Sequence, residues 1–98
     1  MKDFVKRMVE EHAQLITRTQ ALHDYVYGEK SDNDDKVEFA NKCIQLAAMK
    51  KYEEALRARL ENQNIVFDDG KYYEQIGEIK SVVLPKEEAE NAPSNTDK

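Results

Sequence analysis

Two groups of side chains in this sequence have the types and spacing needed to bind an anion. On the first predicted helix the polar residues Arg7, Gln14, Arg18 and Tyr25 follow one another at steps of seven, four and seven, which places them on one face. The second predicted helix ends with Arg57 and Arg59, which an antiparallel hairpin brings back toward Arg7. Guanidinium groups pair with phosphate oxygens, and a nearby ring can stack on a base. The pattern therefore predicts a site for a phosphate-bearing small ligand, formed by Arg7, Arg18, Tyr25, Arg57 and Arg59. The alternative is a solvated helix face covered by ion pairs within each helix.

The two histidines do not form a metal site in one chain. His12 occupies an apolar-type position, which favours a core histidine with satisfied hydrogen bonds over a catalytic or metal-binding one. His23 lies eleven residues further on, so the two rings are about 16 Å apart along the helix. His12 could instead meet its symmetry mate across a dimer interface. We expect no bound metal and no cofactor.

The acidic residues are interpreted as structural. Asp32, Asp34 and Asp35 suggest a calcium loop, but that motif requires a glycine and a glutamate at positions where Val37 and Cys43 stand. We therefore predict a solvated loop in which Asp35 and Glu38 form a capping box. Glu53 and Glu54 are predicted to be surface charges paired with neighbouring Lys or Arg side chains.

The remaining motifs do not favour catalysis. Cys43 is the single cysteine, so no disulfide forms within the chain, and its apolar surroundings predict a small buried side chain. The sequence has no glycine-rich phosphate loop, no Ser-His-Asp order and no Cys/His metal spacing. We predict that the protein is not an enzyme.

The elements that position these residues are mainly helical. A mainly apolar stripe at steps of three and four predicts a helix over residues 2–27, ending at a left-handed Gly28. The stripe consists of Val5, Met8, His12, Leu15, Thr19, Leu22 and Val26. A polar loop leads to a second helix over residues 36–62, so residues 1–64 form an antiparallel helical hairpin. Residues 65–84 predict a short β-extension: two strands around an Asp-Gly turn, and a third run that either forms a strand or packs along the helices. Residues 85–98 are predicted to be a disordered acidic tail.

The second predicted helix has two apolar faces, which favours a homo-oligomer. Its larger side chains form one stripe: Phe39, Cys43, Leu46, Met49, Tyr52, Leu56 and Leu60. A smoother strip beside it consists of Ala40, Ile44, Ala47, Ala48, Ala55 and Ala58. One partner helix cannot easily cover both, so we expect a second chain on the smoother strip, unless residues 65–84 cover it.

The charge balance limits the partners. The 98-residue chain carries a net charge of −5, and residues 1–64 contribute 11 basic and 12 acidic side chains. Duplex nucleic acid is an unsuitable partner, because binding it requires a basic surface. The sequence has neither a signal-peptide pattern nor a run of bilayer-spanning length. A soluble cytoplasmic protein with no membrane contact is expected.

Residues 2–62 resemble a family of small accessory proteins of tailed phages related to the crAss-like group. The resemblance lies in Phe4, Arg7 and the Glu10-Glu11 pair, and in three runs: Leu22-His23-Asp24-Tyr25-Val26, Gln45-Leu46-Ala47-Ala48-Met49-Lys50-Lys51-Tyr52, and Leu56 with Arg59-Leu60. It implies a phage-encoded protein acting in the host cytoplasm. In size and architecture alone, the chain is also similar to phage sponge proteins of the anti-CBASS and anti-Thoeris classes, which sequester cyclic nucleotide signals.

These observations support three hypotheses on function. The first is a non-enzymatic binder that sequesters a nucleotide-type immune signal in pockets between subunits. The second is an inhibitor that binds a host defence or regulatory protein through residues 65–98. The third is a structural or assembly helper that forms a helical bundle.

Overall fold

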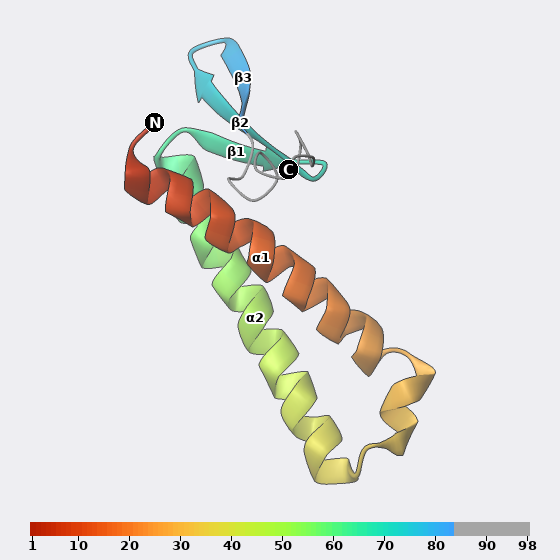
Figure 1. The fold of residues 1–98 in the computed structure, drawn as a ribbon. Helices are drawn as coiled ribbons and strands as arrows, with labels where there is room; N and C mark the ends of the chain where they lie inside the picture. The colour runs from red at the N-terminus through yellow and green to blue at the C-terminus, as the bar shows by residue number, and fades with distance from the viewer. Residues whose placement is uncertain (84–98) are drawn as a thin grey trace, which may run out of the picture.

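The computed structural model describes residues 1–83 and consists of two long helices followed by a small sheet (Figure 1). Helix α1 spans Asp3–Val26 and α2 spans Lys36–Asn62. The strands are β1 (Ile65–Asp68), β2 (Lys71–Ile76) and β3 (Ile79–Val83), in the antiparallel order β1-β2-β3. The predicted mainly helical fold with a C-terminal β-extension is confirmed. The predicted disordered tail lies outside the described residues.

The ends of the helices follow local sequence signals, with one exception. Asp35 caps α2, and its carboxylate accepts a hydrogen bond from the Glu38 backbone N–H at 2.7 Å, as the capping motif predicts. The prediction of a left-handed Gly28 is wrong, because its φ is −105° and its backbone is extended. A glycine is required there for a different reason: a Cβ atom would lie 2.7 Å from the Asp24 carbonyl oxygen.

The connection between the helices is more ordered than the expected loop. It contains a short 3-10 helix, η1 (Glu29–Asn33). Ser31 is buried, and its hydroxyl shares its one proton between the carbonyl oxygens of Gly28 at 2.8 Å and Val26 at 3.2 Å. These two bonds satisfy carbonyl groups at the end of α1 and hold the turn against the helix.

The sheet is a meander whose two turns suit their residues. Asp69 and Gly70 have φ values of 50° and 79°, the left-handed pair that a two-residue hairpin turn of type I′ requires. Gly77 has a φ of 61° at the second turn, between β2 and β3. The third run of residues is therefore a strand, paired with β2 from Ile79 opposite Ile76 to Val83 opposite Tyr72.

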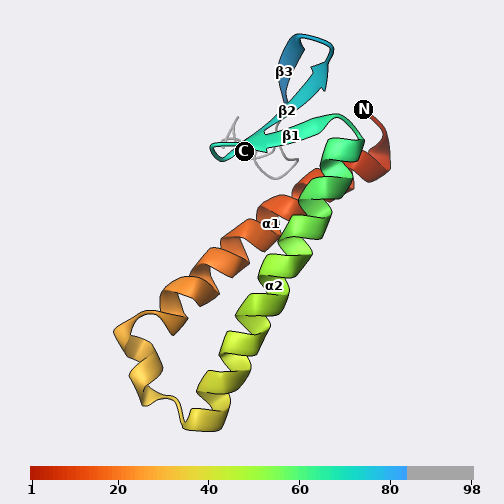
Figure 2. The same ribbon diagram turned by 180° about the vertical axis from the view of Figure 1, so that it is seen from behind.

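The hydrophobic core lies at the sheet end of the hairpin. The two helices converge there and diverge toward the loop, as both views show (Figures 1 and 2). The buried cluster draws on the first half of α1, the end of α2 and the first two strands: Val5, Met8, Val9, Leu15, Leu56, Leu60, Ile65 and Tyr72. Toward the loop the predicted stripes are only half-buried at Leu22, Phe39 and Cys43, which corrects the prediction of a buried cysteine.

The smoother strip of α2 is uncovered in the single chain. Its residues Ala40, Ile44, Ala47, Ala48, Ala55 and Ala58 are all exposed, and the sheet does not pack on them. Ile44 is 67% exposed and Val37, in line with it, is 71% exposed. The alternative in which residues 65–84 cover this strip is therefore wrong for residues 65–83.

Candidate functional site

A chain of hydrogen-bonded polar groups crosses the core where the sheet meets the helices. His12 on α1 is fully buried, and both of its ring nitrogens are engaged. Nδ1 lies 2.6 Å from the Tyr72 hydroxyl on β2, and Nε2 lies 2.8 Å from Oε2 of Glu53 on α2. This confirms the interpretation of His12 as a core histidine with satisfied hydrogen bonds.

Glu53 is the group that connects this buried chain to the surface. Its side chain is only 13% exposed, which corrects the prediction of a surface charge, although the predicted pairing with a basic neighbour is present. Oε2 of Glu53 also accepts from Arg57, at 2.7 Å from Nε and 2.6 Å from Nη2. Burial raises the pKa of Glu53, but the hydrogen bonds from His12 and Arg57 lower it by more, so the net pKa is below its ordinary value.

The ionised state of Glu53 fixes the direction of its hydrogen bond with His12. A carboxylate can only accept, so Nε2 of His12 carries the proton that it donates to Glu53. In neutral His12 the other nitrogen, Nδ1, then accepts from the Tyr72 hydroxyl. The rings of His12, Phe67 and Tyr72 pack together, with centroids 4.8 to 5.5 Å apart.

Arg57 is the outermost member of the chain. Its side chain is 41% exposed, and its guanidinium carbon lies 5.2 Å from the centre of the Phe67 ring on β1. Two of its N–H groups are occupied by Glu53. Arg57, one of the five predicted ligand residues, is thus held by the Glu53 carboxylate on one side and the Phe67 ring on another.

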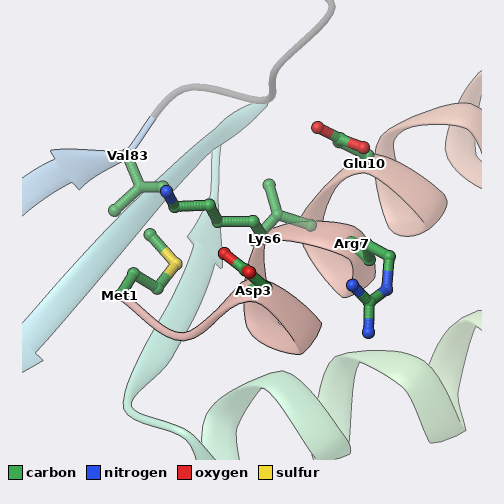
Figure 3. A pocket seen from close by; sticks show the side chains of 7 residues that line it. Met1, Asp3, Lys6, Arg7, Glu10 and Val83 are labelled. Atoms are coloured by element: carbon green, nitrogen blue, oxygen red, sulfur yellow. The ribbon is translucent and has the colours of Figure 1, made fainter.

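Arg7 lines a different surface, a pocket of about 710 Å³ between the start of α1 and β3 (Figure 3). Met1, Asp3, Lys6, Glu10, Val9 and Val83 line it as well. Lys6 extends toward Val83 and Met1, whereas Arg7 points away from them toward α2 (Figure 3). The volume lies in the range of small-molecule sites, but the two cations do not converge.

Arg59 lies in a shallower pocket where the end of α2 meets the start of α1. Phe4 and Met8 of α1 line this pocket of about 300 Å³ together with Arg59. The hairpin therefore brings the end of α2 back to the start of α1, as predicted. Arg57 and Arg59 nevertheless lie in different environments: Arg57 contacts Phe67 of the sheet, whereas Arg59 lines the pocket beside Phe4 and Met8.

Tyr25 is engaged at the opposite end of the hairpin. Its hydroxyl donates to Oδ1 of Asp34 at 3.1 Å, and Nζ of Lys42 lies 4.1 Å from the centre of its ring. Lys42 also pairs with Asp34 at 3.0 Å. The hydrogen bond to Asp34 raises the pKa of Lys42, with a smaller contribution from Tyr25 and an opposing one from burial. This cluster fastens the connection between the helices.

The single chain does not gather the five predicted ligand residues into one pocket. Arg7 and Tyr25 are eighteen residues apart on one helix, a separation of about 27 Å, and the exposed Arg18 lies between them. Arg57 and Arg59 lie at the same end of the hairpin as Arg7 but line separate surroundings. A common pocket for these residues requires more than one chain.

Sequence reasoning did not identify the polar chain that ends at Arg57. The spacing of Glu53 and Arg57, one helical turn apart, was a usable signal for their pairing. The partners Tyr72 and Phe67 lie sixty and fifty-five residues from His12, and no local pattern connects them. The structure also places no group of three or more potential metal-ligating side chains together within residues 1–83. None of the helices in that range has the length and apolar character needed to cross a membrane.

Comparison with known protein families identifies a family for the helical hairpin. A family model described as Sequestin matches residues 2–62, which are α1, the connection and α2. The matched range contains His12, Glu53 and all four arginines, and it ends before the sheet that supplies Phe67 and Tyr72. Neither the curated proteins nor the solved structures contain a match to this chain.

Proposed function

The chain belongs to the Sequestin family, and on that premise we propose that it captures a nucleotide-type bacterial immune signal and withholds it from its receptor. The family name denotes sequestration, which is the work of a binding protein and requires no reaction. In this proposal the protein is encoded by a phage and acts in the cytoplasm of the host. Its pockets lie between the subunits of a homo-oligomer and use Arg7, Arg18, Tyr25, Arg57 and Arg59.

The observation that carries the proposal is the state of the arginines. The chain has four, and only Arg57 has an acidic partner within residues 1–83. Arg7, Arg18 and Arg59 are exposed. Because the chain carries 20 acidic side chains, the unpaired arginines are not explained by a shortage of acids. Guanidinium groups in this state are available to phosphate oxygens.

The uncovered strip of α2 supports the oligomer. A regularly spaced row of alanines with Ile44 at 67% exposure allows a second helix to approach closely. In this proposal a second chain packs on this strip, and arginines of both chains contribute to the shared sites.

Native mass spectrometry tests both parts of this proposal. The protein is purified from bacteria that carry active nucleotide-signalling defence systems, and its mass gives the oligomer and any retained ligand. Titration calorimetry with cyclic di- and trinucleotides and cyclic ADP-ribose isomers then measures affinity. A discrete oligomer that binds one of these compounds supports the proposal. A monomer, or an oligomer that gives no heat with any compound, overturns it.

A second candidate function, inhibition of a host protein, is favoured by the exposed tip of the sheet. Ile76, Ile79 and Val82 are 65%, 70% and 58% exposed, on a hairpin that projects away from the helices (Figure 1). Replacing Ile76 and Ile79 with Ser tests this role better than replacing Tyr72, which is buried. Retention of a host partner by the unaltered chain and its loss from this variant would favour inhibition.

A further inference from the structure

The polar chain through the core has a direction, from a buried interior to an exposed end. Side-chain exposure rises from 0% at His12 to 13% at Glu53 and 41% at Arg57. Neighbouring members are joined by hydrogen bonds: Tyr72 to His12, His12 to Glu53, and Glu53 to Arg57. Arg57 is the only member with substantial access to solvent.

Arg57 has donors left over after these contacts. A guanidinium group carries five N–H bonds, and those that Glu53 engages are on Nε and Nη2. The contacts of residues 1–83 leave both N–H bonds of Nη1 and one of Nη2 unused. The Phe67 ring beside the guanidinium group and the carboxylate behind it restrict the rotation of the side chain.

A side chain held in this way is well suited to bind an oxyanion. Ordering a long, flexible side chain has a free-energy cost on binding, and Glu53 and Phe67 have already restricted Arg57. The exposed arginines Arg7, Arg18 and Arg59 have no comparable support in residues 1–83.

We propose that Arg57 is the anchor for a phosphate group of the ligand, and that Glu53, backed by His12 and Tyr72, is its positioning residue. This inference rests on the proposed function, because it assigns one phosphate contact within the sequestering site. The phosphate oxygens accept from the outer edge of the guanidinium group, the edge that faces away from Glu53. The other arginines then contribute charge, whereas Arg57 fixes where the phosphate sits.

The test follows the arginine side-chain N–H signals by ¹H–¹⁵N NMR during titration with inorganic phosphate and with adenosine 5′-diphosphate. Three variants accompany the unaltered chain. R57K keeps the charge but removes the fork, E53Q removes the positioning charge, and E54Q is the matched control, because Glu54 pairs with Lys51 at 3.8 Å outside the polar chain. Circular dichroism first establishes a temperature at which every variant is folded.

We expect the Arg57 signals to shift in a saturable manner with both probes. R57K and E53Q should each weaken adenosine 5′-diphosphate binding by about tenfold, the loss expected for one charge-assisted hydrogen bond, and E54Q should leave it unchanged. If E53Q does not fold, R57K decides the result. A shift confined to Arg7, Arg18 or Arg59, or unchanged binding by R57K, overturns the inference.

The inference and the proposed function can fail separately. Binding of a cyclic nucleotide that leaves the Arg57 signals unmoved overturns the inference and leaves sequestration standing. Saturable shifts at Arg57 with phosphate, in a protein that binds none of the cyclic nucleotides, support an anion site there and overturn the proposed function. No saturable shift with any probe overturns the inference.

Discussion

The Tyr72 hydroxyl lies 2.6 Å from Nδ1 of His12, and this contact joins the middle strand of the sheet to the first helix. Removing the hydroxyl in Tyr72→Phe leaves a buried nitrogen without this partner. We expect the free energy of unfolding to fall by about 1–3 kcal/mol, the cost of an unsatisfied buried polar group. Urea unfolding followed by circular dichroism measures it. Tyr73→Phe, on the other face of β2, is the matched control and should change stability little; equal midpoints for the two variants would contradict the prediction.

The lowered pKa of Glu53 predicts that the free energy of unfolding decreases as the pH falls into the acidic range. A carboxyl group whose pKa is lower in the folded state contributes stability above its unfolded pKa, near the ordinary value of 4.5, and loses that contribution as the pH falls through the folded pKa. The unaltered chain should therefore lose more stability than E53Q between neutral pH and acid. Unfolding measured from pH 7 down to about pH 3 tests this. Parallel curves for the two proteins would show that Glu53 makes no such contribution.

Gly28 should not tolerate a side chain. An added Cβ would lie 2.7 Å from the Asp24 carbonyl oxygen, and a backbone atom cannot move aside as a flexible side chain can. Gly28→Ala should lower the free energy of unfolding by about 1–3 kcal/mol. Asn33→Ala, at an exposed position of the same connection, serves as the control. A melting temperature unaffected by Gly28→Ala would mean that the end of α1 relaxes without cost.

The exposed strip on α2 predicts an assembly that a single charge can break. Ile44→Glu places a carboxylate in the middle of the strip, where burial against a second chain would be costly. We expect the oligomer to dissociate while the helical content of each chain is retained. Light scattering coupled to size exclusion measures the mass. Thr17→Glu, at an exposed site on α1, should leave it unchanged; an oligomer that stays intact in the Ile44→Glu variant would remove the strip from the interface.

Local signals predicted the two long helices and the first hairpin of the sheet, whereas η1 was expected to be a loop and the third strand was one of two alternatives. The bounds of α2 agree with its capping residue Asp35 and with the change of pattern after Asn62. The Asp69-Gly70 turn could be predicted because a type I′ hairpin turn requires residues that adopt a positive φ. Gly28 was misjudged because its constraint is a close carbonyl group rather than its own φ. Steric contacts of this kind depend on how the chain turns and leave no mark on residue spacing.

The candidate site was predicted in part. Periodicity correctly placed Arg7 and Arg18 on the exposed side of α1, because helical spacing determines which residues share a face. It could not reveal that Arg57 turns toward the sheet, since Phe67 and Tyr72 come from strands whose position over the helices depends on tertiary packing. Whether the five residues meet across chains remains a prediction, to be tested by the oligomer and binding experiments above.

The separation in sequence between His12 and its partners has a consequence for synthesis on the ribosome. His12 emerges early, Glu53 follows 41 residues later, and Tyr72 follows 60 residues after His12. Until the middle strand has been made, the imidazole lacks one of its two partners. Burying it before then would leave a ring nitrogen without a hydrogen bond. The nascent helices can form as they appear, but their common core closes only after translation has passed the second strand.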